Sequence, residues 1–268
     1  MDVTATLPMA WALDLDGVVW LADEPIPGSA DAVARLRAAG AHVVFVTNFS
    51  WGRRSDIADK LARHGIEPGD DVVTSSMAAA AFVAPGERVL VVGGPGVIEA
   101  VESRDAEAIP AGSRQAGSAA VDAVLVGLDP QFDYRMMTIA ATAVRRGARL
   151  LATNDDATYP TATGPVPGGG AVLAAIATAA GVTPVVAGKP HEPIAALVRA
   201  RCGATGVMVG DRPDTDGRFA RTLGWEFALV LTGTVGVDDL PVDPAPERVA
   251  ASLAALVDDV LPDTRSAR

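Results

Sequence analysis

The sequence has little cysteine and few aromatic residues. Cys202 is the single cysteine in 268 residues, and Phe, Trp and Tyr together make up 4%. One cysteine excludes an internal disulfide framework and a zinc site built from cysteines. Because hydrophobic residues still make up 49% of the chain, its core must consist of Ala, Val and Leu. This composition favours parallel α/β layers over an aromatic-rich β-sandwich.

Positive charge and long hydrophobic runs are also scarce. The 22 Lys and Arg residues against 33 Asp and Glu residues give a formal charge of −11, which argues against non-specific binding to nucleic acid or anionic membranes. No apolar run approaches the ~18 residues of a membrane-spanning helix, and the first residues lack the positive stretch of a signal peptide. We therefore expect a soluble, cytoplasmic protein that binds an anionic ligand only through local cations.

Short β-branched runs alternate with helical stripes along the chain. The strand-length runs lie at 43–46, 89–92, 124–126, 207–209 and 228–231, and helical patterns lie at 33–39, 133–146, 171–180 and after Pro193. Such alternation is typical of βαβ units and a parallel sheet. The sequence therefore predicts an α/β fold with a doubly wound parallel sheet. Its length suits two domains.

Two acidic stretches each follow a strand-length apolar run. Asp14-Leu15-Asp16-Gly17-Val18 follows one run, and Gly210-Asp211-Arg212-Pro213-Asp214-Thr215-Asp216 follows another. Taken alone, each is compatible with a turn or a helix cap. Buried carboxylates at a sheet edge are costly unless a cation balances them, and oxygen ligands suit a hard divalent metal. Ligands of doubly wound sheets bind where the strand order reverses, so we expect the two stretches to meet there.

This expectation divides the chain into two domains. The segment between the two halves of the acidic site has strand and helix patterns of its own, enough for a separate α/β unit. We predict a catalytic core formed by residues 1–75 and 187–268, and an inserted α/β cap domain formed by residues 76–186.

Two further polar motifs stand at predicted strand or helix ends. Thr47-Asn48 follows a strand and presents donors that suit a tetrahedral anion, although a polar turn explains it equally well. Lys189 lies between Gly188 and Pro190 in a turn before a helix. A lone lysine is usually solvated, but these neighbours restrict it and favour a functional role.

Taken in order, the four motifs resemble those of the haloacid dehalogenase superfamily of aspartate-nucleophile phosphatases. The motifs are Asp14-Leu15-Asp16-Gly17-Val18, Thr47-Asn48, Lys189, and Gly210-Asp211 with Asp216. Further stretches narrow the resemblance to the NagD-like and 4-nitrophenyl or phosphoglycolate phosphatase branch, which carries a large type IIA α/β cap. They are Gly127-Leu128-Asp129, Thr153-Asn154-Asp155-Asp156, Pro167-Gly168-Gly169-Gly170 and Gly188-Lys189-Pro190.

The resemblance implies a role for each motif residue. Asp14 is the nucleophile that forms an aspartyl-phosphate, and Asp16 is the general acid and base. Mg²⁺ is the cofactor, with Asp14, the backbone carbonyl of Asp16 and Asp211 as ligands. Thr47, the backbone of Asn48 and Lys189 hold the substrate phosphate, and Asp216 positions Lys189 and assists the metal shell. In the cap, Asp129 and Asp156 are candidates for specificity, although structural turns explain them at least as well.

The reaction that follows is hydrolysis of small phosphomonoesters. The alternatives are a phosphotransferase, a 2-haloacid dehalogenase, or a phospho-ligand sensor without turnover. Asp16 and Asp211 argue against dehalogenation, which in this superfamily uses one aspartate and no metal. A small phosphorylated metabolite is the expected partner, with a homodimer through the cap plausible. The sequence does not choose among glycerol phosphate, phosphoglycolate, sugar phosphates, nucleotides and pyridoxal phosphate.

Overall fold

The computed structural model describes residues 8–159, 161 and 164–261, which form two compact units. The first unit comprises the described parts of 1–46, 58–72 and 195–268, and the second comprises those of 47–57 and 73–194. The domain boundaries predicted from the sequence, 1–75 and 187–268 against 76–186, stay a prediction.

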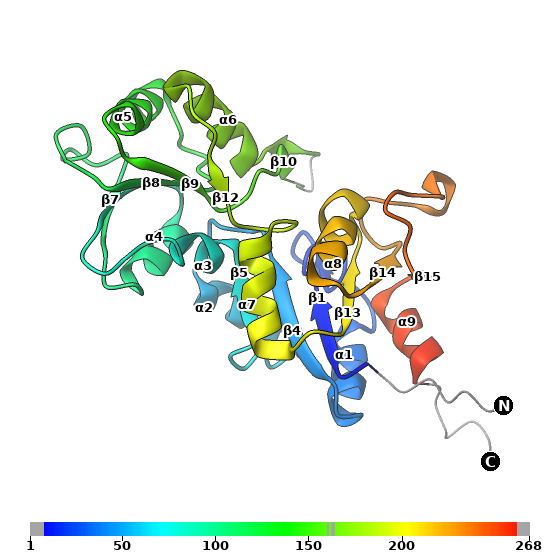
Figure 1. Ribbon diagram of the computed structural model, residues 1–268. Coiled ribbons are helices and arrows are strands. Elements are labelled where there is room, and N and C mark those ends of the chain that lie inside the picture. Colours follow the sequence, from blue (N-terminus) through cyan, green and yellow to red (C-terminus); the bar gives the residue numbers. More distant parts are fainter. Residues whose placement is uncertain (1–7, 160, 162–163, 262–268) are drawn as a thin grey trace, which may run out of the picture. The chain divides into compact units, whose positions relative to one another are not determined.

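The first unit contains most of a six-stranded sheet in the order β15-β14-β13-β1-β4-β5 (Figure 1). These strands are β1 (Ala10–Leu13), β4 (His42–Thr47), β5 (Val72–Thr74), β13 (Val207–Gly210), β14 (Glu226–Val230) and β15 (Arg248–Ala250). β1 pairs in parallel with both β4 and β13, so the strand order reverses between β1 and β13. The chain builds outward from β1 on one side and from β13 on the other, which is the predicted doubly wound arrangement.

Helices alternate with the strands of this sheet along the chain, and the last helix follows the last strand. They are α1 (Ser29–Ala38), α2 (Arg54–Arg63), α7 (Glu192–Cys202), α8 (Arg218–Leu223) and α9 (Leu253–Val260). Two shorter turns are a π-helical turn at Pro213–Gly217 and a 3-10 turn at Val237–Asp239. A small antiparallel ribbon is formed by β2 (Trp20–Leu21) and β3 (Glu24–Pro25). β1 is fully buried, as expected for a central strand covered on both faces.

The second unit is built on a five-stranded parallel sheet in the order β12-β9-β8-β6-β7. Its strands are β6 (Arg88–Val92), β7 (Glu107–Pro110), β8 (Ala123–Val126), β9 (Arg149–Ala152) and β12 (Val185–Val186), and its helices are α3 (Ser75–Ala80), α4 (Pro95–Glu102), α5 (Tyr134–Arg145) and α6 (Gly169–Ala180). Leu90, Val124 and Ile176 belong to a core of aliphatic side chains. A two-stranded ribbon joins β10 (Thr158–Tyr159) to β11 (Val166–Pro167).

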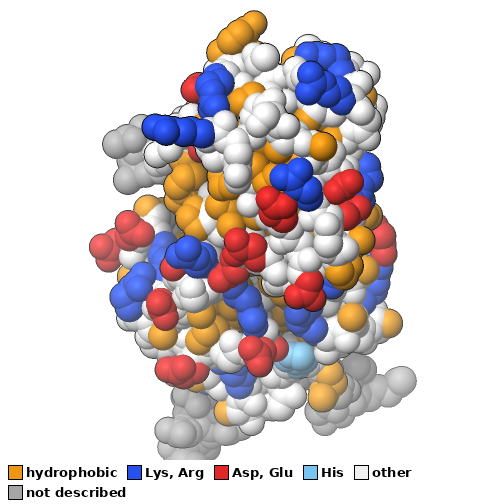
Figure 2. Space-filling model, turned by 90° about the vertical axis from the view of Figure 1, so that its left-hand side faces the viewer, with side chains coloured by type: hydrophobic (Ala, Val, Ile, Leu, Met, Phe, Trp, Pro, Cys, Tyr) orange, Lys and Arg blue, Asp and Glu red, His pale blue; other side chains and the backbone are white. Residues whose placement is uncertain are grey.

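The surface carries charges of both signs. Figure 2 shows one face of the molecule, on which Lys and Arg side chains are interspersed with Asp and Glu side chains. Among the described residues, no helix combines the length and the apolar character needed to cross a membrane.

Candidate active site

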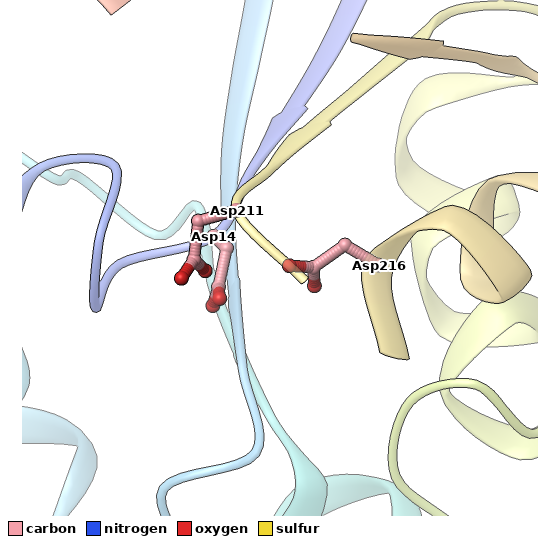
Figure 3. A group of neighbouring side chains, drawn as sticks. All are labelled: Asp14, Asp211 and Asp216. Atoms are coloured by element: carbon pink, nitrogen blue, oxygen red, sulfur yellow. The ribbon is translucent and has the colours of Figure 1, made fainter. Parts of the chain in front are cut away.

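Three aspartates gather where the strand order of the first unit reverses. Asp14 follows β1, Asp211 follows β13, and Asp216 lies in the π-helical turn that comes next. A carboxylate oxygen of each lies within 4.8 Å of the others. Figure 3 shows the side chains of Asp14 and Asp211 side by side, with Asp216 approaching from its turn. The two acidic stretches therefore meet as the topology predicts.

Burial makes this carboxylate cluster a site for a cation. Asp14, Asp211 and Asp216 expose 8%, 2% and 0% of their surface. Buried like charges at this separation repel strongly unless a cation balances them. Hard divalent metals such as Mg²⁺ prefer carboxylate oxygens. The donor set thus fits the cofactor predicted from the sequence.

Glycines let the backbone approach these carboxylates. Gly17 has a φ of +81°, and a Cβ built there would lie 2.6 Å from Cγ of Asp211. A Cβ at Gly210 would collide with the Asp216 side chain, and one at Gly233 with Asp211. Side chains at these positions would displace the carboxylates, so the Gly of Asp14-Leu15-Asp16-Gly17-Val18 is part of the site.

Thr234 fixes Asp211 and was not singled out from the sequence. Its backbone N–H donates to Oδ2 of Asp211 at 2.7 Å, and its hydroxyl donates to the Asp211 carbonyl at 3.1 Å. The available signal was the polar triplet Thr232-Gly233-Thr234 after the strand at 228–231, which is a polar strand end like those at Asp14, Thr47 and Asp211.

Asp16 lies outside the carboxylate cluster. It is partly exposed, and the indole Nε1 of Trp20 donates to its Oδ1 at 3.0 Å. This contact orients the carboxylate independently of the cluster, as a separate acid–base role requires. The resemblance assigns the backbone carbonyl of Asp16, and not its carboxylate, as the metal ligand.

Thr47, Asn48 and Lys189 belong to the second unit. The Oγ1 of Thr47 accepts a hydrogen bond from the backbone N–H of Phe49 at 3.0 Å, which leaves the hydroxyl hydrogen to be donated elsewhere. Lys189 exposes 1% of its surface. The peptide group of Lys189 is hydrogen-bonded by the side chain of Asn48, so the structure brings these two predicted residues together.

The two cap candidates have different surroundings. The Oδ1 of Asp129 accepts from the N–H of Gln131 at 2.9 Å, closing a local turn. The Oδ2 of Asp156 accepts from Nδ2 of Asn48 at 2.9 Å. Asp129 is thus engaged within its own turn, whereas Asp156 reaches a motif more than a hundred residues away in the chain.

His191, just after the Lys189 turn, pairs with Asp155. Their side chains approach to 3.0 Å, with 36% and 48% of each exposed. The hydrogen bond with Asp155 raises the pKa of His191, and the same bond lowers the pKa of Asp155. His191 is therefore hydrogen-bonded to Asp155 just before α7, and forms an ion pair with it when the imidazole is protonated.

Fold and site together define a doubly wound α/β protein with a buried carboxylate cluster for a divalent cation at its switch point. Comparison with known proteins gives the family. The model of haloacid dehalogenase-like hydrolases matches residues 11–107, and a HAD-hydrolase-like model matches 186–256. The chain is 37% identical over 245 residues to an acid sugar phosphatase of Staphylococcus saprophyticus, covering 88% of this chain and 92% of that protein. The chain therefore belongs to the haloacid dehalogenase-like hydrolases.

Solved structures agree with this assignment. A p-nitrophenyl phosphatase from Archaeoglobus fulgidus is 30% identical with a TM-score of 0.86, over 94% of this chain and 99% of that one. Glycerol phosphate phosphatase from Mycobacterium tuberculosis, in complex with calcium, is 32% identical with a TM-score of 0.83, over 93% of this chain and 74% of that one. The same protein has been solved with magnesium. The predicted family and fold class are thus confirmed.

Proposed function

We propose that the protein is a Mg²⁺-dependent phosphatase that hydrolyses small phosphomonoesters through an aspartyl-phosphate on Asp14. The buried cluster of Asp14, Asp211 and Asp216 carries this proposal, because it combines a cation site with a carboxylate placed at a strand end. Relatives named as acid sugar, glycerol phosphate and p-nitrophenyl phosphatases support it.

Asp14 and Asp16 divide the chemistry. A carboxylate oxygen of Asp14 attacks phosphorus as the bond from phosphorus to the ester oxygen breaks. Asp16 gives its proton to the departing alkoxide. Asp16 then takes a proton from water, whose oxygen attacks phosphorus, breaks the bond to Asp14 and releases inorganic phosphate. The indole of Trp20 holds Asp16 in one orientation for both transfers.

Asp14 and Asp211, with the backbone carbonyl of Asp16, would hold the Mg²⁺, while Asp216 completes the acidic surroundings. The bound cation offsets the repulsion between the Asp14 carboxylate and the phosphate dianion. The backbone N–H of Thr234 holds the Asp211 carboxylate in place before the cation binds. Gly17 and Gly233, which have no Cβ, leave the room that this carboxylate needs.

Thr47 and Lys189 are proposed to bind the phosphoryl oxygens, together with the backbone of Asn48. The Thr47 hydroxyl retains its hydrogen for donation, and Lys189 supplies a cation to a strongly acidic chain. Charge on the transferring phosphoryl group is stabilised mainly by such fixed donors. A small phosphorylated metabolite as substrate, the cap as specificity domain, a homodimer and cytoplasmic location stay predictions.

The test is phosphate release from 4-nitrophenyl phosphate with Mg²⁺ and with EDTA. We expect turnover in Mg²⁺, its loss in EDTA, and its loss in Asp14→Asn. A phosphometabolite panel that includes glycerol phosphate and sugar phosphates, ranked by kcat/KM, then identifies the substrate class. Binding of phosphoesters without turnover would favour a sensor, phosphoryl transfer to an added alcohol a phosphotransferase, and chloride release from 2-chloropropionate a dehalogenase.

A further inference from the structure

The side chain of Asn48 is paired with the backbone of Lys189. The Lys189 N–H donates to Oδ1 of Asn48 at 2.8 Å, and Nδ2 of Asn48 donates to the Lys189 carbonyl at 2.9 Å. The side-chain amide of Asn48 thus binds both the N–H and the carbonyl of the Lys189 backbone, as one strand binds the backbone of its neighbour in a sheet. Such two-point pairing fixes direction as well as distance, so Asn48 determines where the backbone of Lys189 lies.

The second hydrogen of the Asn48 amide is also used. Nδ2 donates to Oδ2 of Asp156 at 2.9 Å, which is a charge-assisted hydrogen bond. These partners also fix which end of the amide is oxygen, because Lys189 N–H requires an acceptor and Asp156 a donor. With both amide hydrogens donated within the protein, the Asn48 side chain is engaged in structure, and only its backbone is left for a substrate phosphate.

The backbone of Asn48 is anchored as well. Its carbonyl accepts from Nδ2 of Asn154 at 2.8 Å and from Oγ of Ser75 at 2.9 Å. Both donors are buried. Ser75 and Asn154, from two other segments of the second unit, therefore hold the backbone of Asn48. A shift of either segment would move Asn48 and, through it, the backbone of Lys189.

Gly188 is needed for the close approach of these segments. A Cβ at Gly188 would lie 2.5 Å from Oδ1 of Asn48 and would also collide with the carbonyl of Thr153. Any larger residue there would separate Asn48 from the Lys189 turn. The glycine of Gly188-Lys189-Pro190 is thus explained by this pairing.

We infer that Asn48 is the positioning residue for Lys189, and that Asp156 is a positioning residue that orients Asn48 rather than a contact for the substrate's leaving group. This inference rests on the proposed function only for the role of the Lys189 ammonium. The hydrogen bonds of Asn48, Lys189 and Asp156 lie within one unit, so their effect on the Lys189 backbone is measurable without any activity.

The first experiment measures hydrogen exchange of the Lys189 amide by mass spectrometry of a peptide spanning 187–191. Pro190 has no N–H, so few amides contribute to this peptide. In Asn48→Ala the Lys189 N–H loses its acceptor, and we expect exchange up to about 10-fold faster, which corresponds to the upper end of about 0.5–1.5 kcal/mol for one hydrogen bond. Gln131→Ala, which removes an exposed amide from the same unit, should leave the exchange unchanged. Unchanged exchange in Asn48→Ala, with an unchanged melting temperature, overturns the inference.

The second experiment is kinetic and separates positioning from recognition. Asn48→Asp keeps the acceptor for Lys189 but turns a carboxylate towards Asp156 and the Lys189 carbonyl. Because misplacing a binding group by about 1 Å costs about 100-fold, we expect kcat/KM to fall by roughly that factor. The factor should be equal for 4-nitrophenyl phosphate and glycerol phosphate, since both present the same phosphoryl group.

Asp156 is tested by two substitutions. Asp156→Ala should lower kcat/KM about 10-fold for both substrates, corresponding to one charge-assisted hydrogen bond. Asp156→Asn keeps an acceptor for Asn48 and should restore most of the activity. A changed preference between the two substrates in Asp156→Asn would show that Asp156 contacts the leaving group, and would overturn its assignment. If the wild type releases no phosphate while exchange at Lys189 responds as expected, the proposed function fails, and the assignment of Asn48 as the positioning residue for the Lys189 backbone stands.

Discussion

Neutralising one member of the carboxylate cluster should stabilise the protein without metal and abolish its response to Mg²⁺. Asp211→Asn is the appropriate change, because the amide has the same shape and its oxygen can still accept from the N–H of Thr234. Two unit charges within 4.8 Å of each other repel by at least ~3 kcal/mol at an effective dielectric constant of about 20. The substitution removes two of the three pairwise repulsions in the cluster.

The measurable gain is smaller than this sum, because local rearrangement and water around the carboxylates relieve part of the repulsion. We expect Asp211→Asn in EDTA to be about 1–3 kcal/mol more stable than the wild type. For a chain of this size this raises the melting temperature by about 2–10 °C. Mg²⁺ at 100 times its Kd should stabilise the wild type by about 2.7 kcal/mol, and should leave the variant unchanged.

The assay is thermal unfolding of both proteins with EDTA and across a Mg²⁺ titration. Asp214→Asn is the matched control, since it removes the same charge from the same turn at a side chain that is 62% exposed and paired with Arg212. This control should keep the full response to Mg²⁺. A response of Asp211→Asn equal to that of the wild type would refute the carboxylate cluster as the metal site.

Three further predictions concern Gly17, the His191–Asp155 pair and Cys202. Gly17→Ala forces a left-handed backbone onto alanine and a Cβ against Asp211, so phosphatase activity should be lost and stability should fall by about 1–3 kcal/mol. The His191–Asp155 pair should add less than about 1 kcal/mol, because both side chains are partly exposed. Its raised His191 pKa and lowered Asp155 pKa place that contribution between roughly pH 4 and 6.5, with loss above as His191 deprotonates. Burial raises the pKa of Cys202 to about 11, so its thiol should react slowly with alkylating reagents at pH 7.5.

Each of these expectations has a contrary result. Normal activity in Gly17→Ala would mean that the Asp211 side chain can move away from the added Cβ and still support the reaction. A melting-temperature difference between the wild type and His191→Gln that grows from pH 6 to pH 9 would contradict the sign of the His191 shift. Complete labelling of Cys202 within minutes in the folded protein, at the rate of a small thiol, would contradict its raised pKa.

The sequence predicted the central strands well, because β4, β6, β8 and β13 are valine-rich apolar runs and β1 is an apolar run, which suits a sheet covered on both faces. Edge strands were missed for a physical reason. β7 (Glu107–Pro110) and β15 (Arg248–Ala250) are short and carry charged residues or proline, so only pairing with a neighbour defines them as strands. Gly40, which follows α1, has a left-handed φ of +86°, as is typical of a glycine just after a helix.

The acidic site was predictable because topology alone brings strand ends together at a switch point. Its supports were not. Thr234 binds Asp211 from a loop whose path no local pattern specifies, and Asn48 reaches Lys189 across 141 residues. Asp156 was a candidate for specificity in the predicted cap, and only the fold shows that its carboxylate binds Asn48.

The most direct test of the central claim is to trap the phosphorylated enzyme. Wild-type protein mixed with 4-nitrophenyl phosphate and Mg²⁺ is quenched in acid within the first turnover, and its peptides are analysed by mass spectrometry. We predict one phosphoryl group on the peptide that contains Asp14, located at that residue, and none in Asp14→Asn. Release of phosphate by an enzyme that carries no phosphoryl group on Asp14, or carries it on another residue, would contradict the account.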